Sequence, residues 1–527
     1  MLLKALIVVH RWVGVVLSVL FFLWFSSGIG MMYWGMPAIS NQDRLDRMAP
    51  LDAAAIKISA EEAASTIGEK AMPGQIRLTT FDGHPAYRFD NGCIVYADTG
   101  VEQTQSGQAM RDRMVSTWTG QPVSAATVES VTETDQWMVG NRLRTLRPLW
   151  KYSWPDGQAA YIGESGEVLL HTTRGSRLRA YLSAIPHWLY FTPLRKHQPV
   201  WIRIATYSAM VGVGGAIIGI IVGLWMYSPV KKYRFAGGPS SIPYRGQKRW
   251  HTILGLVFGL ATVTWTFSGS LAFRPFPPPE RPRIQNDTQR NSPGNRQRGQ
   301  GRQRGGNSSL ASALRGEVEM SDFAELSPKD VLSRVGDLHA KELSYTSFAG
   351  QPLYSLTLSD GSSRFVSLDG QIVTEFDREK IVWLIKKSVP EPEKLELRTL
   401  EQYDAYYQDR TGRKALPVIL ALTNDAEATR YYIDPKTASV VGSYSNSNWV
   451  NRWLYHGLHS LNFPFLYNHR PLWDIVVITF MVGGTALCVT SLVLAWRAIG
   501  KKLQQVARGA RDRNTFSPRE RVARRAG

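Results

Sequence analysis

Six of the ten histidines in this sequence lie next to long apolar segments. They are His10, His187, His197, His251, His459 and His469. A neutral imidazole binds metal ions, and its proton affinity suits proton transfer near neutral pH. An ionisable side chain beside a membrane-spanning segment is costly and is functional by default. The positions of these residues therefore indicate metal or proton chemistry at a membrane.

Two internal matches keep the six histidines aligned. At an offset of 241 residues the matching pairs are His10 and His251, Gly14 and Gly255, Trp24 and Trp265, and Ser27 and Ser268. At an offset of 272 they include His187 and His459, His197 and His469, and Gly212 and Gly484. Two internal matches at different offsets, each of which aligns histidines, are hard to obtain by chance. We expect two halves of the same topology, related by a pseudo-twofold axis along the membrane normal.

Four uncharged apolar runs are long enough to cross a bilayer, which takes about 20 residues. They are residues 12–34, 204–227, 252–273 and 475–496. The first run is too long for a signal peptide and predicts an uncleaved anchor. The net charge of +19 is concentrated between and after the runs, in 229–250, 281–304 and 498–527. This distribution argues against nucleic-acid binding. By the positive-inside rule it places 229–250 and both termini in the cytoplasm.

These assignments divide the chain into nine parts. The four transmembrane helices occupy 1–34, 199–228, 251–274 and 471–497. Residues 229–250 form a basic cytoplasmic loop and 498–527 a basic cytoplasmic tail. Residues 35–198 and 311–470 are expected on the periplasmic side of a bacterial inner membrane. Residues 275–310 are rich in arginine, proline and glycine and predict a disordered linker.

Each periplasmic segment begins with a helix and continues with alternating strands. Ser59 and Glu62 form a predicted capping box, and Ser327 followed by Pro328 predicts the matching helix start. Strands are predicted at 86–89, 94–97, 150–154 and 159–162, and again at 353–358, 365–368, 418–422 and 430–433. The pattern is typical of small α+β modules.

The helix and hairpins at 58–100 and 326–370, with YYIDPKTASVVG at 431–442, resemble PepSY modules. The segments VHRWVGVVLSVLF, RWHTILGLVFGLA and RWLYHGLHSLNFPFLYNHRPLW resemble the PepSY-associated transmembrane family. The resemblance covers most of the chain, without the linker and the basic tail. It implies a membrane α-helical bundle of four transmembrane helices with a pseudo-twofold internal repeat, and two extracytoplasmic α+β PepSY-like domains.

The family includes iron-regulated inner-membrane proteins, among them ferric-siderophore reductases that hold two b-type haems between their helices. The resemblance thus implies haem b, with two groups in this chain. A twofold axis would bring His10 and His251 face to face, as ligation of one haem by two imidazoles requires. The sequence departs from simpler members in the linker and in His456, whose counterpart in the first half is Ala184.

The ligands of the second haem are left open by the sequence. His187 and His459 are the favoured pair, because a histidine in that segment resembles the recurrent one of the family. His197 and His469 are the alternative pair, and a mixed pair such as His187 with His469 is also compatible with the pattern.

The favoured function is electron transfer across the inner membrane to a periplasmic ferric siderophore or another iron chelate, which is an oxidoreductase activity. The electrons would come from an unidentified cytoplasmic donor or from quinol, since no phosphate-binding or dinucleotide motif is present. The alternative is a non-enzymatic PepSY membrane protein that binds a periplasmic peptide, protease or siderophore in iron uptake or regulation. A proton-relaying permease ranks last, because the histidines lie at the membrane faces and not at the midplane.

Overall fold

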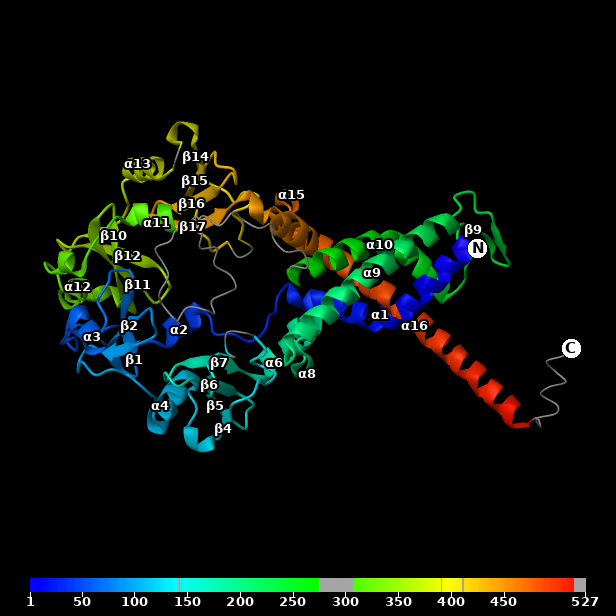
Figure 1. Ribbon diagram of the computed structural model, residues 1–527, viewed down its shortest axis with the longest axis horizontal. Coiled ribbons are helices and arrows are strands. Elements are labelled where there is room, and N and C mark those ends of the chain that lie inside the picture. The colour runs from blue at the N-terminus through cyan, green and yellow to red at the C-terminus, as the bar shows by residue number, and fades with distance from the viewer. Residues whose placement is uncertain (141–142, 144, 274–306, 390, 410–411, 516–527) are drawn as a thin grey trace. The chain divides into compact units, whose positions relative to one another are not determined.

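The computed structural model describes residues 1–515 except 141–142, 144, 274–306, 390 and 410–411 (Figure 1). The chain forms two compact units. The helical unit contains Met1–Met36, Leu178–Pro279 and Val450–Gly527, and the β-rich unit contains Pro37–Arg177 and Glu280–Trp449. The predicted linker at 275–310 lies outside the described residues, apart from its last four, which begin helix α11 (Asn307–Arg315).

Four long helices build the helical unit. They are α1 (Leu2–Met31), α9 (Gln198–Met226), α10 (Gln247–Ser270) and α16 (Leu472–Thr515). Each is long and apolar enough to cross a membrane, and in α16 this part is Leu472–Arg508. Helix α1 begins ten residues before the predicted run 12–34, and α10 begins five residues before 252. His10 and His251 are therefore part of the spanning helices and not of the preceding loops.

The four helices surround a common centre. Helix α1 packs against α9 and α16, and α10 packs against the same two helices, so that α1 and α10 lie at opposite corners (Figure 1). Glycines on α9 and α16 allow close approach, because a Cβ atom at Gly212 would collide with Phe21 and one at Gly484 would collide with Phe25. Small residues at such crossings permit tight helix packing in membranes.

Short helices precede α9 and α16 in the same order. Helices α7 (Ala184–Trp188) and α8 (Thr192–Arg195) lead into α9, and α14 (Leu458–Ser460) and α15 (Pro464–Tyr467) lead into α16. Leu189 and Leu461 end α7 and α14 in the left-handed region, at φ 53° and 46°. A π-helical turn, Val450–Gly457, precedes α14. The hairpin of β8 (Tyr233–Phe235) and β9 (Gly238–Ser240) connects α9 to α10.

An antiparallel seven-stranded sheet forms the centre of the β-rich unit, in the order β13-β12-β11-β10-β1-β2-β3. The strands are β1 (Ile76–Phe81), β2 (His84–Phe89), β3 (Ile94–Tyr96), β10 (Glu342–Phe348), β11 (Gln351–Thr357), β12 (Ser363–Ser367) and β13 (Ile372–Val373). Strands β1 and β10 pair with Leu78 opposite Leu343. The hairpins of the two predicted modules thus share one sheet, since this pairing satisfies the hydrogen bonds of two otherwise open edges.

The helices that open the two modules start as predicted. Ser59 and Glu62 form the capping box of α3 (Ala60–Thr66). Ser327 accepts the first hydrogen bond of α12 (Pro328–Arg334), with Pro328 at its first position. The remaining helices of this unit are α2 (Asn41–Arg47), α4 (Gln108–Thr119), α13 (Arg378–Ser388) and α6 (Arg174–Leu182), which continues into the helical unit. Short 3-10 turns occupy Val123–Ala125, Met320–Phe323, Gly336–Leu338, Pro392–Lys394, Asn446–Asn448 and, in the helical unit, Leu271–Phe273.

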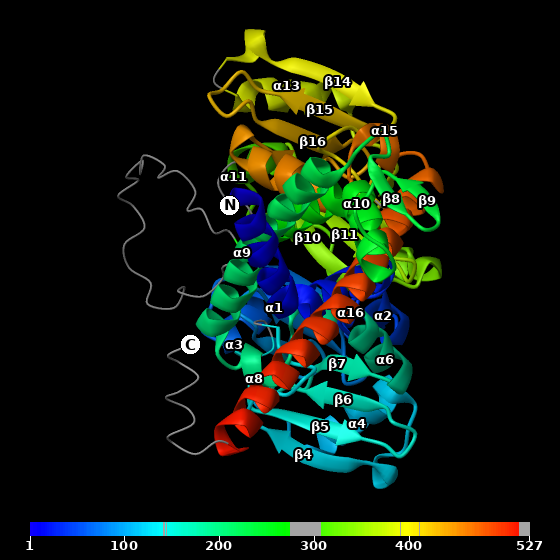
Figure 2. The ribbon, with the colours of Figure 1, turned by 90° about the vertical axis from the view of Figure 1, so that its right-hand side faces the viewer.

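Two four-stranded antiparallel sheets complete the β-rich unit (Figure 2). One contains β4 (Thr127–Val131), β5 (Leu149–Ser153), β6 (Ala159–Ile162) and β7 (Val168–Thr172). The other contains β14 (Glu396–Leu400), β15 (Val418–Leu422), β16 (Arg430–Asp434) and β17 (Ser439–Tyr444). Both have a register shift in the third strand, between Tyr161 and Ile162 and between Tyr432 and Ile433. The predicted strands at 159–162 and 418–422 coincide with β6 and β15.

Glu342 stabilises the β1–β10 junction. Its side chain is buried, and its carboxylate contacts Arg44 at 2.5 Å and Arg77 at 3.6 Å. We expect Glu342→Ala to destabilise the protein by about 1–3 kcal/mol, since the two guanidinium groups lose a charged hydrogen-bond partner. The thermal unfolding midpoint of the full chain in detergent measures this loss. Glu391→Ala is the control, because its contact with Lys394 is exposed and is worth less than about 1 kcal/mol. Equal midpoints for the two variants would contradict a role for Glu342.

Candidate functional site

The structure pairs four of the six histidines across the helical unit. His10 on α1 faces His251 on α10, with 6.0 Å between ring centroids and 42° between ring planes. His187 on α7 faces His459 on α14, also at 6.0 Å and with 58° between planes. Each pair connects the α1 side of the bundle with the α10 side. For His187 and His459 this follows because α7 packs against α1 and α14 packs against α10. The two pairs are called the His10–His251 site and the His187–His459 site below.

The rings of the His187–His459 site have matching partners. Nδ1 of His187 lies 3.2 Å from the Trp24 carbonyl oxygen and 3.2 Å from Oγ of Ser27. Nδ1 of His459 lies 3.2 Å from the Trp265 carbonyl oxygen and 3.2 Å from Oγ of Ser268. The partners on α1 and α10 are the residues that match at an offset of 241. Each imidazole is thus fixed by the last turns of a spanning helix.

The rings of the His10–His251 site are held by the other two long helices. Nδ1 of His10 lies 2.9 Å from the Gly215 carbonyl oxygen on α9. Nδ1 of His251 lies 3.2 Å from Oγ1 of Thr490 on α16. Among the described residues, every hydrogen bond of the four paired rings uses Nδ1. Anchoring one ring nitrogen leaves Nε2 of each ring for a ligand, which is how metal-binding histidines are usually oriented.

The spacing of the rings fits a metal ion between them. A bond from imidazole nitrogen to metal is about 2 Å long, so two imidazoles on opposite sides of one metal have ring centroids about 6 Å apart. Both pairs have this spacing. Among the described residues no group of three or more His, Cys, Asp or Glu side chains is placed to hold a metal ion. Each site therefore offers a metal ion two imidazole ligands from the protein.

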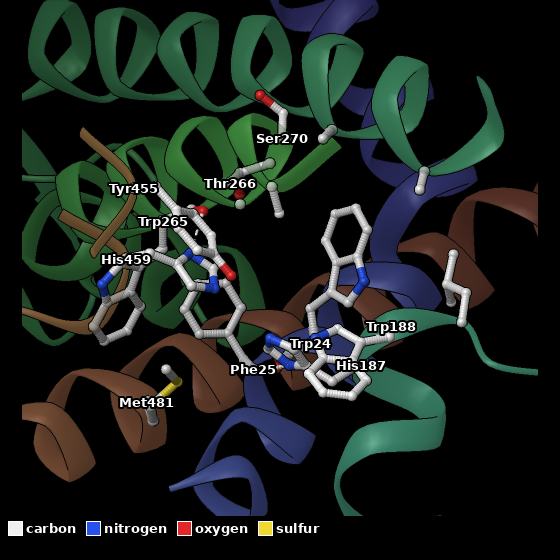
Figure 3. Close-up of a pocket in the computed structure, with 15 residues that line it drawn as sticks. Trp24, Phe25, His187, Trp188, Trp265, Thr266, Ser270, Tyr455, His459 and Met481 are labelled. Carbon is white, nitrogen blue, oxygen red and sulfur yellow. Dashed lines mark hydrogen bonds between the residues drawn. The ribbon is translucent and has the colours of Figure 1, made fainter. Parts of the chain in front are cut away.

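A cavity adjoins the His187–His459 site (Figure 3). It contains about 740 Å³ of empty space, including the part that opens to the surroundings. Its lining is mostly aromatic and small, with Trp24, Phe25, Trp188, Trp265, Ala205, Ala209 and Gly269 beside the two histidines. Nε1 of Trp265 is buried and has no hydrogen-bond partner among the described residues. The cavity thus offers two imidazoles and room for a flat apolar ligand.

Burial lowers the pKa of both histidines that face this cavity, which lie outside the four spanning segments. For His187, repulsion by His459 adds to the effect of burial on the pKa. For His459, burial is again the main cause of the lowered pKa, and the neighbouring His456 adds to it. Both imidazoles are therefore neutral near pH 7, which is the form that ligates metals.

The structure does not bring His197 and His469 together. Both are exposed, at the starts of α9 and α16, where their backbone carbonyls accept hydrogen bonds from Trp201 and Trp473. No ring contact between these two histidines occurs among the described residues. Of the alternatives that the sequence left open, the geometry favours His187 with His459.

The sequence did not reveal three contributors to the sites. Gly219 lies against the ring of His10, where an added Cβ atom would be 2.5 Å from Cε1. Gly28 and Gly269 lie against His187 and His459, with Cβ positions 3.7 Å and 3.1 Å from their Cε1 atoms. Gly28 and Gly269 match at an offset of 241, and this match is a signal that could have found them.

The comparisons with known proteins identify one family. The sequence matches the PepSY-associated TM region over residues 249–524, which is more than half of the chain. The chain belongs to the PepSY-associated TM family. The match includes α10 and α16, and with them His251 and His459. No curated protein matches the chain. With the four apolar helices, membership of the PepSY-associated TM family makes this a multi-pass membrane protein in a lipid bilayer.

Gly219→Ala tests how the His10–His251 site of this PepSY-associated TM protein is packed. The new methyl group would displace the His10 ring, and we expect a loss of about 1–3 kcal/mol in unfolding free energy, as for other overpacked sites. Gly214→Ala on the same helix is the control, because the added Cβ meets open space. It should be neutral or stabilising, by up to about 1 kcal/mol. Thermal unfolding in detergent compares the two, and a Gly219→Ala protein as stable as the control would contradict the packing described.

Proposed function

We propose that this protein is a b-type haem protein of the bacterial inner membrane that passes electrons across the bilayer and reduces a periplasmic ferric siderophore or another iron chelate. The observation that carries the proposal is the pair of equally spaced imidazole couples, each held through Nδ1. A structural role for four histidines would not require the same 6.0 Å separation in both sites.

His10 and His251 would hold one haem, and His187 and His459 would hold the other. The protein contributes four imidazoles of fixed orientation and, at the second site, a cavity without charged side chains. A bound haem would supply an iron that takes up and releases one electron. The axial ligands and the polarity of the cavity would tune its reduction potential.

The two sites lie near opposite ends of the spanning helices. On α1, His10 is 14 residues before Trp24, which corresponds to about 21 Å along a helix. Aromatic rings occupy the space between. Phe258 contacts Phe480, Phe480 contacts Trp265, and Trp265 contacts Phe25, with ring centroids 5.9–6.1 Å apart. This apolar interior supports the passage of electrons between two fixed cofactors.

The proposal includes the internal repeat and the orientation of the chain. Matching partners of His187 and His459, together with the matching order of short helices, support an origin from two copies of one helix–domain–helix unit. The basic loop 229–250 supports cytoplasmic termini, with the β-rich unit as two joined PepSY-like domains in the periplasm. The electron donor would then be a cytoplasmic protein or quinol.

A reduced-minus-oxidised visible spectrum of the detergent-purified protein, with haem quantified per chain, tests the proposal. We expect a b-type signal near two haems per chain, and the loss of about one haem in His251→Ala and in His459→Ala, since each removes one axial ligand. His197→Ala and His469→Ala are matched controls and should keep both. Protein without haem, produced with adequate iron and haem supply, would overturn the proposal.

A further inference from the structure

Three aromatic rings connect the His187–His459 site with the protein surface. The Tyr455 ring lies over the His459 ring, with centroids 5.5 Å apart and planes 17° from parallel. The His456 ring lies 4.9 Å from the Tyr455 ring. Tyr455 lines the cavity, whereas His456 is exposed. The series therefore runs from a candidate metal ligand, along the cavity wall, to solvent.

The backbone that carries these rings is unusual. Tyr455 and His456 belong to the π-helical turn Val450–Gly457. Such turns are rare and occur frequently at functional sites. At the matching positions of the first half stand Ser183 and Ala184, which have no rings. The series thus exists in the second half alone and is not needed to build a histidine pair.

A buried positive charge lies on the same turn. The Arg452 side chain is 5% exposed, stacks on Trp453 at 4.4 Å and donates a hydrogen bond to the Asn462 carbonyl oxygen. Its charge acts on His456 and favours an anion at the adjacent surface. Iron chelates formed by carboxylate, hydroxamate or catecholate oxygens commonly carry negative charge.

We propose that Tyr455 and His456 form the route by which an electron leaves the His187–His459 site, and that the His456 imidazole contacts the incoming ferric chelate. This inference rests on the proposed function and specifies where its substrate binds. The step would move one electron: a reduced haem held by His187 and His459 would supply it, and the chelated Fe(III) would become Fe(II). No covalent bond of the protein forms or breaks.

The first test measures binding without electron transfer. Gallium(III) nitrilotriacetate resembles the ferric complex, has open coordination positions and is not reduced. We expect His456→Ala to weaken its binding to the purified protein about tenfold or more, as for the loss of one hydrogen bond to a charged group. Asn468→Ala, an exposed substitution in the same unit, should bind as the wild type does. Equal affinity in wild type and His456→Ala would overturn contact at His456.

The second test measures electron transfer. Stopped-flow absorbance follows oxidation of the reduced protein by ferric nitrilotriacetate. Tyr455→Leu removes the ring and should slow this oxidation about tenfold or more, whereas Tyr455→Phe keeps the ring and should retain most of the rate. Haem content and reduction potentials of both variants should equal those of the wild type, which distinguishes a transfer route from a role in positioning His459. Equal rates for Tyr455→Leu and wild type would overturn the route.

The two proposals fail in different ways. Wild-type protein without haem would remove the electron-transfer function and the route with it, while the gallium experiment would still report on His456 as a contact for chelates. Wild-type protein with two haems, whose oxidation is insensitive to both Tyr455 and His456, would leave the proposed function intact and overturn this inference.

Discussion

The helical unit depends on holding four imidazoles at fixed orientation inside an apolar bundle. An imidazole in such a place needs at least one hydrogen-bond partner, because an unsatisfied polar group away from water is costly. Most backbone carbonyls of a spanning helix already accept a hydrogen bond within the helix. A carbonyl can accept one from a side chain only near the end of the helix, or where it accepts a second hydrogen bond. Trp24 and Trp265 provide such carbonyls near the ends of α1 and α10, with Ser27 and Ser268 beside them. The positions of these two groups on α1 and α10 determine where the short helices α7 and α14 can place their histidines.

Space for the rings comes from glycines on neighbouring helices. Gly219 accommodates His10, and Gly28 and Gly269 accommodate the other pair. Glycines also leave room for the aromatic rings between the sites, since Gly484 faces Phe25 and Gly483 faces Phe258. Adding a methyl group at such a contact requires a ring or a helix to move. The spacing of the histidines therefore depends on glycines, which carry no functional group.

The sequence predicted the elements of this structure better than their contacts. Capping by Ser59 and Ser327 depends on neighbours three residues away and could be predicted. The strands β6 and β15 could also be predicted, because each is a short, continuous apolar run. The β1–β10 junction joins segments more than 260 residues apart, and no local pattern signals it. All four paired histidines were among the candidates, because two sequence matches at fixed offsets aligned them. The choice between His187 and His197 needed the packing of α7 on α1, which spacing alone does not give.

Departures from the repeat make the bundle directional. Ser183, Ala184 and Ala209 of the first half correspond to Tyr455, His456 and Met481 of the second half. All three substitutions in the second half replace small side chains by large ones, and two of them line the cavity. A perfectly symmetric bundle would present the same surface on both sides of its axis and would offer two equivalent ways out of the cavity. Because Tyr455, His456 and Met481 all belong to the second half, the two sides are unequal. The asymmetry of the bundle therefore lies in the residues around the paired histidines and not in the histidines themselves.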